Sequence, residues 1–444
     1  MYTPLPKLPK VSRRADDIAT LKPIPYLGCD LEWDIKTEVP TILGLSDGAK
    51  TVSVPFGEGR QAFQTLLRRY SKAVIAGHNF ISSDLPVLAG MGIHIDPSQV
   101  QDTILHYWLT NMNLCKSSKK DDDEAERRGA GFMNLWTMLS LYTDLSNYKH
   151  CRQDACEGPC PEHDVFGYNG LDALGPVLAL PKMLKQATFM GVDKLYPLHR
   201  KLSLILYEMR QTGILIDRAY VAKLRDNFDT AKGILYNKET ETGRLPFNPD
   251  SPKQVREFFS AHKISLKNTR EETIKNACEK HGIGDLESDD PAIGEGERAL
   301  LSLRDWKALG DGPDRWFKPR VWNSRKNEWE GYVHEDGCVR PHLGFFTSTA
   351  RFQCTSPNMQ NVPARRRDIV TGEKMKKVIR RAIIAPEGYY LAKFDYQNAE
   401  NRVFLHLAGY HIPKGVDLHE WVRQIAKINE DSDFARSLGG ARDA

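Results

Sequence analysis

Four acidic side chains and one tyrosine in the first part of the chain have the types and the spacing of a metal site. Asp30 and Glu32 are one residue apart in a stretch whose alternation predicts a β-strand, so both carboxylates would point to the same face. Asp84 follows a second apolar stretch, and Tyr168 lies one helical turn before Asp172. Carboxylates supply the hard oxygen ligands that divalent metal ions prefer. An isolated Asp-x-Glu pair also occurs on solvent-facing strands, so only the whole set points to a site.

The chemistry that needs such a set is phosphodiester hydrolysis with two metal ions. One Mg²⁺ or Mn²⁺ generates hydroxide, and the other stabilises the leaving oxygen. A phenol one turn before the last carboxylate can orient the attacking water by hydrogen bonding.

A fifth carboxylate, Asp395, lies near the other end of the sequence. It follows the apolar stretch Tyr389–Phe394, for which we predict a strand, and it precedes a stretch with a helical pattern that contains Glu400 and Arg402. A carboxylate where a strand ends can also hold a metal ion.

A short turn-rich segment offers ligands of another kind. Its cysteine and histidine side chains could bind one tetrahedral Zn²⁺, which would be structural. The candidate ligands are Cys151, Cys156, Cys160 and His163. Their spacing does not match a standard zinc knuckle, and the alternative is a set of reduced surface cysteines.

The elements that must position the first set of acids have the pattern of an α/β layer domain. Predicted strands are Tyr26–Trp33, Thr41–Ser46, Thr51–Val54 and Ala73–Gly77, and predicted helices are Gln61–Tyr70 and Leu85–Met91. The first three strands should be neighbours in one sheet. The proline-dotted arm before them should be irregular, and the charged segment 115–131 should be an exposed loop.

The pattern changes after about residue 194. Residues 194–228 are helical in pattern, with Leu202, Ile205, Leu206 and Met209 at core spacing. Ser251 followed by Pro252 is a typical helix start, and residues 300–309 resume a helix. After residue 339 short strands and turns dominate, followed by a predicted helix at 417–428.

Composition sets limits on location and partners. The 444 residues include 62 Lys plus Arg against 58 Asp plus Glu, an excess too small to indicate nucleic-acid binding by itself. Residues 361–381 are locally basic, which suits phosphate contacts, although a solvated charged face gives the same pattern. The sequence has neither a membrane-length apolar run nor a signal peptide, so we expect a cytoplasmic protein without a membrane partner.

The ordered acidic set resembles exonuclease motifs I, II and III of the DEDDy-type 3'-to-5' proofreading domain found in family A DNA polymerases. The resemblance covers about residues 26–195 and implies an RNase H-like fold. It implies that Asp30, Glu32, Asp84 and Asp172 hold two metal ions and that Tyr168 positions water. The substrate would be a single-stranded 3' end of DNA.

Three later segments resemble the polymerase part of the same family. Leu206–Asp217 and Phe247–Gln254 are similar to its thumb, and the segment from Ser356 to Pro363, with Arg351 before it, is similar to the segment that lies along primer and template. The residues that would contact DNA there are Arg351, Asn358, Gln360 and Asn361.

Residues 395–402 resemble polymerase motif A. On that resemblance Asp395 is a catalytic palm carboxylate, Glu400 is the steric gate that excludes a ribose 2'-hydroxyl, and Arg402 belongs to the nucleotide-binding set. Gln397, Asn398 and Asn401 depart from the family pattern.

The resemblance implies an arm (1–25), an exonuclease domain (26–195), a mostly helical thumb-like region (196–338) and a partial α+β palm (339–444). The fingers and the second palm aspartate of motif C would come from a complementary chain, without which the dNTP could not be used. A phage replication protein is the expected source. The alternatives are a stand-alone 3'-to-5' exonuclease and a non-catalytic DNA-binding subunit.

Overall fold

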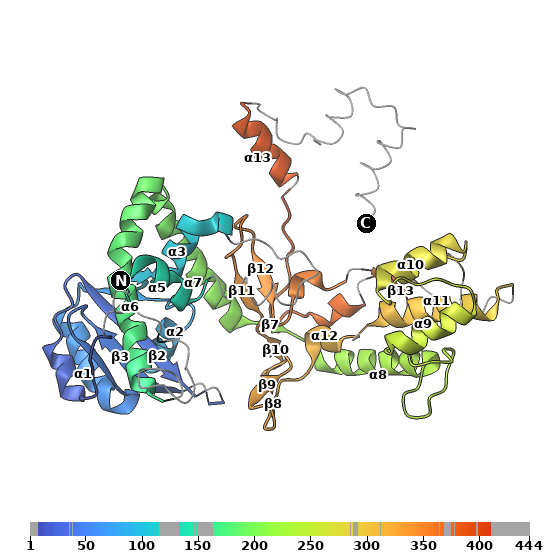
Figure 1. Cartoon of the computed structure of the whole chain (residues 1–444), viewed down its shortest axis with the longest axis horizontal. Coiled ribbons are helices and arrows are strands. Elements are labelled where there is room, and N and C mark those ends of the chain that lie inside the picture. Colours follow the sequence, from blue (N-terminus) through green and yellow to red (C-terminus); the bar gives the residue numbers. More distant parts are fainter. Residues whose placement is uncertain are drawn as a thin grey trace, which may run out of the picture. The chain divides into compact units, whose positions relative to one another are not determined.

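The computed structural model describes most of the chain, and it divides into two compact units, Met1–Ile384 and Ala385–Ala444 (Figure 1). The described residues are 8–34, 36–37, 39–114, 133–145, 148, 163–284, 286, 292–310, 312–363, 365–367, 374–376, 378–396 and 398–409. The loop predicted at 115–131 and the helix predicted at 417–428 lie outside them.

A six-stranded mixed sheet forms the N-terminal part of the first unit, with strand order β1-β4-β3-β2-β5-β6. The strands are β1 (Val11–Ser12), β2 (Tyr26–Trp33), β3 (Pro40–Ser46), β4 (Thr51–Pro55), β5 (Val74–Gly77) and β6 (Val100–Asp102). Strand β3 runs antiparallel to both β2 and β4, whereas β5 is parallel to β2 and β6 is parallel to β5. The predicted neighbours β2, β3 and β4 are confirmed.

Two helices cover opposite faces of this sheet. Helix α6 (Val165–Met190) packs on β2 and β3, and helix α1 (Phe56–Arg69) packs on β3 and β4. On β3 the α-carbon of Gly44 faces α6, while the neighbouring Leu43 faces α1. Successive residues of a strand point to opposite faces, so the two helices lie on opposite sides.

The N-terminal arm is ordered where the structure describes it, which corrects the predicted irregular arm. Strand β1 pairs in parallel with β4, and a 3₁₀ helix follows at Ala15–Thr20. Ile18 and Leu21 of this segment are buried in the core of the sheet domain. Apolar burial of two side chains outweighs the tendency of scattered prolines to keep the segment open.

Three further helices complete this domain: α2 (Asp84–Gly90), α3 (Thr103–Asn111) and α5 (Leu135–Tyr142). They contribute to two apolar cores. One lies between the sheet and α1, and the other packs α3 and α5 against α6.

The helix predicted across 194–228 is interrupted. Helix α7 (Tyr196–Thr212) ends at Gly213, whose φ of 72° few other residues adopt, and β7 (Ile214–Leu215) separates it from α8 (Arg218–Leu235). The predicted core role of Met209 is wrong, since 53% of that residue is exposed. Ile205 is also exposed, whereas Leu206 is buried as predicted.

A second helical region follows α7 and surrounds its own core. Its helices are α8, α9 (Pro252–Ala261), α10 (Glu271–Lys280), α11 (Glu295–Leu309) and α12 (Asp314–Phe317). The predicted helix start at Ser251 is confirmed, because the Ser251 Oγ accepts a hydrogen bond from the Gln254 N–H. Among the described residues no helix is both long enough and apolar enough to cross a bilayer.

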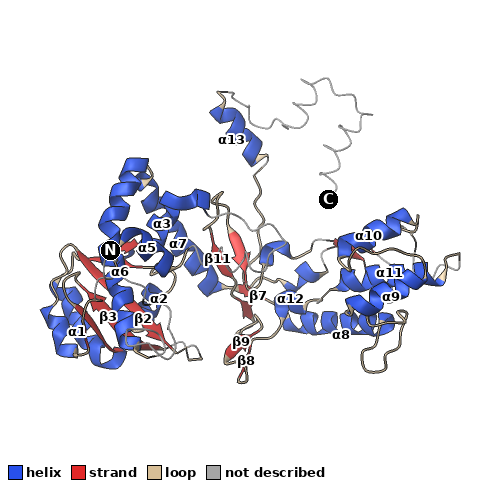
Figure 2. Ribbon diagram, viewed as in Figure 1, coloured by secondary structure: helices blue, strands red, loops and turns tan. Residues whose placement is uncertain are grey.

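Short strand pairs make up the strands of the rest of the first unit (Figure 2), and those after residue 339 confirm the short strands predicted there. They are β7 with β10 (Cys338–Val339), β8 (Val321–Asn323) with β9 (Glu328–Glu330), β11 (His342–Gly344) with β12 (Gln353–Thr355), and β13 (Arg365–Arg367) with β14 (Lys374–Lys376).

The second unit departs from the sequence prediction at one element. Residues 389–394 form no strand and pair with none of the described strands, so the strand predicted there is wrong. Their apolar side chains are exposed, with Tyr390 at 87% and Phe394 at 92%. Among the described residues no strand lies beside this stretch to form the ladder of hydrogen bonds that a β-strand needs. The predicted helical stretch after Asp395 is present as α13 (Ala399–Leu407).

Candidate functional site

Three of the four predicted metal ligands meet in the sheet domain. Asp30 and Glu32 on β2 and Asp172 on α6 each offer a carboxylate oxygen, and these atoms lie within 4.8 Å of one another. Asp30 and Glu32 are half-buried, whereas Asp172 is 6% exposed. Such a concentration of negative charge is costly unless hydrogen bonds or a cation offset it.

Close packing of α6 on the sheet brings these carboxylates together. A side chain at Gly28 would place its Cβ 1.9 Å from the backbone oxygen of Ala173, so β2 and α6 are nearly in backbone contact there. Gly44 likewise leaves room for Asn169. The helix begins at Asp164, whose carboxylate accepts the Gly167 N–H at 2.9 Å.

Asn169 links the helix to the strand by side-chain hydrogen bonds. Its Nδ2 donates to Asp30 Oδ2 at 2.8 Å and to the Asp30 backbone oxygen at 3.2 Å, while its Oδ1 accepts from Ser53 Oγ at 2.7 Å. Asn169 and Ser53 are fully buried. These bonds fix the orientation of the Asp30 carboxylate from within the protein.

Tyr148 orients the carboxylate of Asp172, as Asn169 orients that of Asp30. Its hydroxyl donates to Asp172 Oδ1 at 2.8 Å, and the residue is 2% exposed. Burial, followed by the carboxylates of Asp172 and Asp30, raises the pKa of Tyr148 well above its usual value. The phenol therefore keeps its proton and remains a donor at physiological pH.

The fourth predicted ligand, Asp84, lies beside this group and outside the 4.8 Å set. Its Oδ1 accepts the backbone N–H of Leu31, the residue between the two strand carboxylates, at 2.9 Å. Its Oδ2 lies 2.5 Å from the Ser83 hydroxyl. Burial raises the pKa of Asp84 to about 7. Metal coordination by Asp84 stays a prediction.

Asp102 supports the loop that carries Asp84, a role that the sequence reasoning missed. Its carboxylate accepts the N–H groups of Asn79 at 2.7 Å and Ile81 at 3.0 Å, and it also caps α3. Burial raises the pKa of Asp102 to about 6. The only sequence signal for it is an acidic residue before a helical stretch, which is common.

Tyr168, the predicted water-positioning residue, is half-buried on the first turn of α6. Its ring meets that of Tyr148 nearly edge-on, with centroids 6.0 Å apart. The predicted zinc ligands Cys151, Cys156 and Cys160 lie outside the described residues, and His163 is exposed.

The predicted DNA-contacting residues flank β12: Arg351 precedes the strand, and Asn358, Gln360 and Asn361 follow it. Asn358 caps the 3₁₀ turn at Met359–Asn361, and its backbone oxygen accepts the Trp316 indole N–H at 2.9 Å. Arg351, Gln360 and Asn361 are exposed. The segment is thus fixed by its backbone while several polar side chains face outward.

Asp395, Glu400 and Arg402 belong to the second unit. Asp395 follows the exposed stretch 389–394, and the other two lie on the first turn of α13. Asp395 and Glu400 are exposed, and Arg402 is half-buried.

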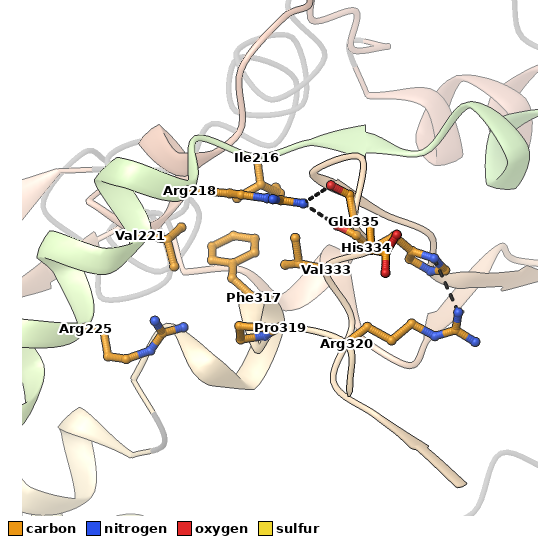
Figure 3. Close-up of a pocket in the computed structure, with 10 residues that line it drawn as sticks. All are labelled: Ile216, Arg218, Val221, Arg225, Phe317, Pro319, Arg320, Val333, His334 and Glu335. Atoms are coloured by element: carbon orange, nitrogen blue, oxygen red, sulfur yellow. Dashed lines mark hydrogen bonds between the residues drawn. The ribbon is translucent and has the colours of Figure 1, made fainter. Parts of the chain in front are cut away.

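A cavity of about 310 Å³ lies at the start of α8, lined by apolar side chains and three arginines (Figure 3). Arg218 donates to the backbone oxygens of His334, at 2.6 Å, and Glu335. Arg225 pairs with Asp314 at 2.7 Å. These bonds connect α8 to the loop before β10 and to α12. Arg218 and Arg225 therefore stabilise the packing at the start of the helical region.

Comparison with known proteins finds a similarity in the second half of the chain. The model of the family described as "DNA polymerase family A" matches residues 218–425. The match covers slightly less than half of the chain, and it shows that these residues are similar to that family. The matched stretch contains the predicted DNA-contacting segment and Asp395, Glu400 and Arg402. The carboxylate centre, which consists of Asp30, Glu32 and Asp172, lies before it.

Curated relatives of the chain include bacterial DNA polymerases. DNA polymerase I of Rhizobium leguminosarum is 26% identical over 240 residues, which is 52% of this chain and 21% of that protein. The thermostable DNA polymerase I of Thermus aquaticus is 29% identical over 235 residues, 49% of this chain and 24% of that protein. The chain thus spans about a quarter of the length of these relatives.

A solved structure extends the likeness in fold to nearly the whole chain. The POL domain of Pol1 from M. smegmatis, solved in complex with DNA primer-template and dNTP, has a TM-score of 0.63. The alignment of the two structures covers 98% of this chain and 70% of the other, with 18% sequence identity. At this identity the likeness concerns the fold.

Proposed function

We propose that the chain is a DNA replication protein that joins a 3'-to-5' DNA exonuclease to the primer-template-binding part of a family A polymerase. The observation that carries the nuclease is the meeting of Asp30, Glu32 and Asp172 within 4.8 Å. The same chain contains a stretch that matches the model of DNA polymerase family A. Removal of mismatched 3' ends is the reaction that such a combination serves.

The donor set fits Mg²⁺ or Mn²⁺. All three gathered side chains offer carboxylate oxygens, the ligands of hard cations, and no soft sulfur ligand belongs to the described group. Two bound ions would supply an activated water and stabilise the leaving oxygen. Asp84 would complete the ligand set, since its carboxylate is bonded to the backbone between Asp30 and Glu32.

The protein's own groups would orient the reactants. Tyr168, on the same helical face as Asp172, would hydrogen-bond the attacking water. Asn169 keeps Asp30 from rotating, which preserves the separation of the carboxylates. The strand order, with β2 between antiparallel β3 and parallel β5, supports an RNase H-like domain.

The nuclease is tested on a 3'-labelled single-stranded DNA with and without Mg²⁺. The double variant Asp30→Ala/Glu32→Ala removes two ligands and should lower the rate at least about a thousandfold, or ~4 kcal/mol of barrier. The matched control is Asp16→Ala/Glu58→Ala, which removes two exposed acids of the same domain. Undiminished cleavage by the first variant would refute the nuclease assignment.

The polymerase part would hold primer-template DNA through the residues on either side of β12. Exposed Arg351, Gln360 and Asn361, with Asn358, would contact the sugar-phosphate backbone and the minor groove. Asp395 would bind a metal ion, Glu400 would exclude ribonucleotides, and Arg402 would assist dNTP binding.

Exposed apolar side chains in the second unit support an association that completes the polymerase site. Tyr390, Phe394, Phe404 and Leu407 are each at least 70% exposed. We propose that they pack against the fingers and the remaining palm, whether these belong to a longer form of the protein or to a complementary chain. Those parts would also provide the second palm carboxylate and the groups that grip the triphosphate.

Primer extension tests this association. The 444-residue chain should extend a primer only when a fingers-and-palm fragment of a family A polymerase that lacks its own motif A is added. Asp395→Ala should abolish the restored synthesis and spare the exonuclease, whereas the exposed Glu387→Ala should affect neither. Robust primer extension by the chain alone, if it is lost in Asp395→Ala, would contradict the proposal that the fingers and the remaining palm must be added.

Two subsidiary proposals concern zinc and location. Cys151, Cys156, Cys160 and His163 would hold one structural Zn²⁺, and elemental analysis of protein purified without chelator should find about one equivalent. We place the protein in the cytoplasm, which is the host cytoplasm if a phage encodes it.

A further inference from the structure

Asp172 receives a hydrogen bond from a buried tyrosine that the proposed reaction does not use. The Tyr148 hydroxyl donates to Asp172 Oδ1 at 2.8 Å, and the two residues are 2% and 6% exposed. Tyr148 is a member of the apolar cluster that contains Leu139 and Leu171. Its ring is therefore held by packing, and its hydroxyl is held at the carboxylate.

A neutral donor suits a cation site better than a charged one. An arginine or lysine bonded to Asp172 would lower the negative charge that attracts the metal ions. A phenol stabilises the charged carboxylate while leaving its charge in place. It also restricts rotation of the carboxylate about its Cβ–Cγ bond, so less conformational entropy is lost when a metal ion binds.

We propose that Tyr148 is a positioning residue of the metal centre, which orients Asp172 toward Asp30 and Glu32. The inference rests on the proposed nuclease function. It divides the work between two neighbouring tyrosines. Tyr168, half-buried, would act on the attacking water, and Tyr148, buried, acts on a ligand.

The same cluster provides a matched control. Tyr142 is also buried, at 6% exposure, and its hydroxyl donates to Gln186 Oε1 at 2.6 Å, away from the carboxylates. Tyr142→Phe and Tyr148→Phe each remove one buried hydroxyl and keep the ring. A difference between them therefore reports on Asp172 and not on the loss of a buried hydrogen bond.

The experiment measures Mn²⁺ affinity by electron paramagnetic resonance on the full chain without DNA, together with exonuclease rate against Mg²⁺ concentration. Tyr148→Phe should weaken Mn²⁺ binding by about tenfold, the lower end of the usual effect of outer-shell partners, and excess Mg²⁺ should restore most of the rate. Tyr168→Phe should keep wild-type Mn²⁺ affinity and lose rate at every Mg²⁺ concentration. Tyr142→Phe should change neither.

Two results would overturn the inference and are distinguishable. If the wild-type chain binds Mn²⁺ and degrades 3' ends, and Tyr148→Phe matches it in Mn²⁺ affinity, Tyr148 does not position Asp172 and the nuclease assignment stands. If the wild-type chain neither binds Mn²⁺ nor degrades DNA, the proposed function fails and the inference fails with it.

Discussion

Asp172 and Asp395 are both carboxylates of predicted metal sites, yet their surroundings differ. Asp172 is nearly buried, bonded to Tyr148, and close to two carboxylates whose own positions are fixed by Asn169 and β-sheet pairing. Asp395 is exposed and follows a stretch that pairs with none of the described strands. A site of the first kind is organised before any ligand arrives, whereas a site of the second kind must be completed by other groups.

The largest expected effect on the organised carboxylate group comes from a change at Asn169. Asn169→Ala removes the bonds to Asp30 and leaves the Ser53 hydroxyl buried without its acceptor. We expect a loss of about 3 kcal/mol in the free energy of unfolding, and a roughly hundredfold loss of exonuclease rate, typical of an outer-shell partner. Thermal unfolding and the 3'-end assay measure the two effects.

The control for this variant is Asn134→Ala. Asn134 caps α5, because its Oδ1 accepts the Thr137 N–H at 2.7 Å. It should cost about 1 kcal/mol of stability without loss of rate. Equal rates for the two variants would show that the carboxylate centre does not depend on Asn169.

A second test uses the raised pKa of Asp84, about 7 against an ordinary value near 3.9. The folded metal-free protein binds this proton more tightly than the unfolded chain. Its stabilising contribution is therefore complete below about pH 4 and is lost as the pH rises through 7. Asp84→Asn mimics the neutral form, so it should raise the melting temperature at pH 8 by several degrees and have little effect at pH 4.

The sign of this effect has an internal control. Hydrogen bonds from Ser98 lower the pKa of exposed Asp96, so Asp96→Asn should destabilise the protein slightly at pH 8. Added Mg²⁺ should stabilise the wild type and not Asp84→Asn if Asp84 is a ligand. If metal-free Asp84→Asn melts at a lower temperature than the wild type at pH 8, the assigned upward shift of the Asp84 pKa is contradicted.

The smallest expected effect concerns the outward-facing DNA segment. Arg351→Ala should weaken binding of primer-template DNA a few-fold, and should reduce the slope of log affinity against log salt by about one. Fluorescence anisotropy across a salt series measures both. Lys280→Ala, on the last turn of α10, serves as a control for loss of one exposed cation. An unchanged slope in Arg351→Ala would remove this residue from the interface.

Sequence reasoning succeeded where short-range pattern decides structure. Strand alternation placed Asp30 and Glu32 on one face, and helical spacing placed Tyr168 beside Asp172. It failed at Gly213, where one left-handed residue ends α7, and at residues 389–394, where an apolar stretch has no strand to pair with. The end of α7 is a local effect of one glycine, whereas the outcome at residues 389–394 depended on neighbours distant in sequence.

The supporting residues of the candidate site were not predictable for the same reason. Tyr148 is 24 residues from Asp172, and its contact with that residue exists only because α5 and α6 share a core. Asn169 adjoins Tyr168 in the sequence, but nothing there shows that its amide would reach Asp30. Metal ligands can be predicted from their residue types and spacing in the sequence. The residues that orient them can be identified only from their contacts in the folded structure.

Gly28 has a consequence for how this centre could vary. A methyl group there would meet the backbone oxygen of Ala173 at 1.9 Å, so Gly28→Ala must act as a spacer that lifts α6 away from β2. Every ligand would remain, but Asp172 would move away from Asp30 and Glu32. The distance between the carboxylates is therefore set by a residue without a side chain, and the centre can be detuned by a substitution that alters none of its chemistry.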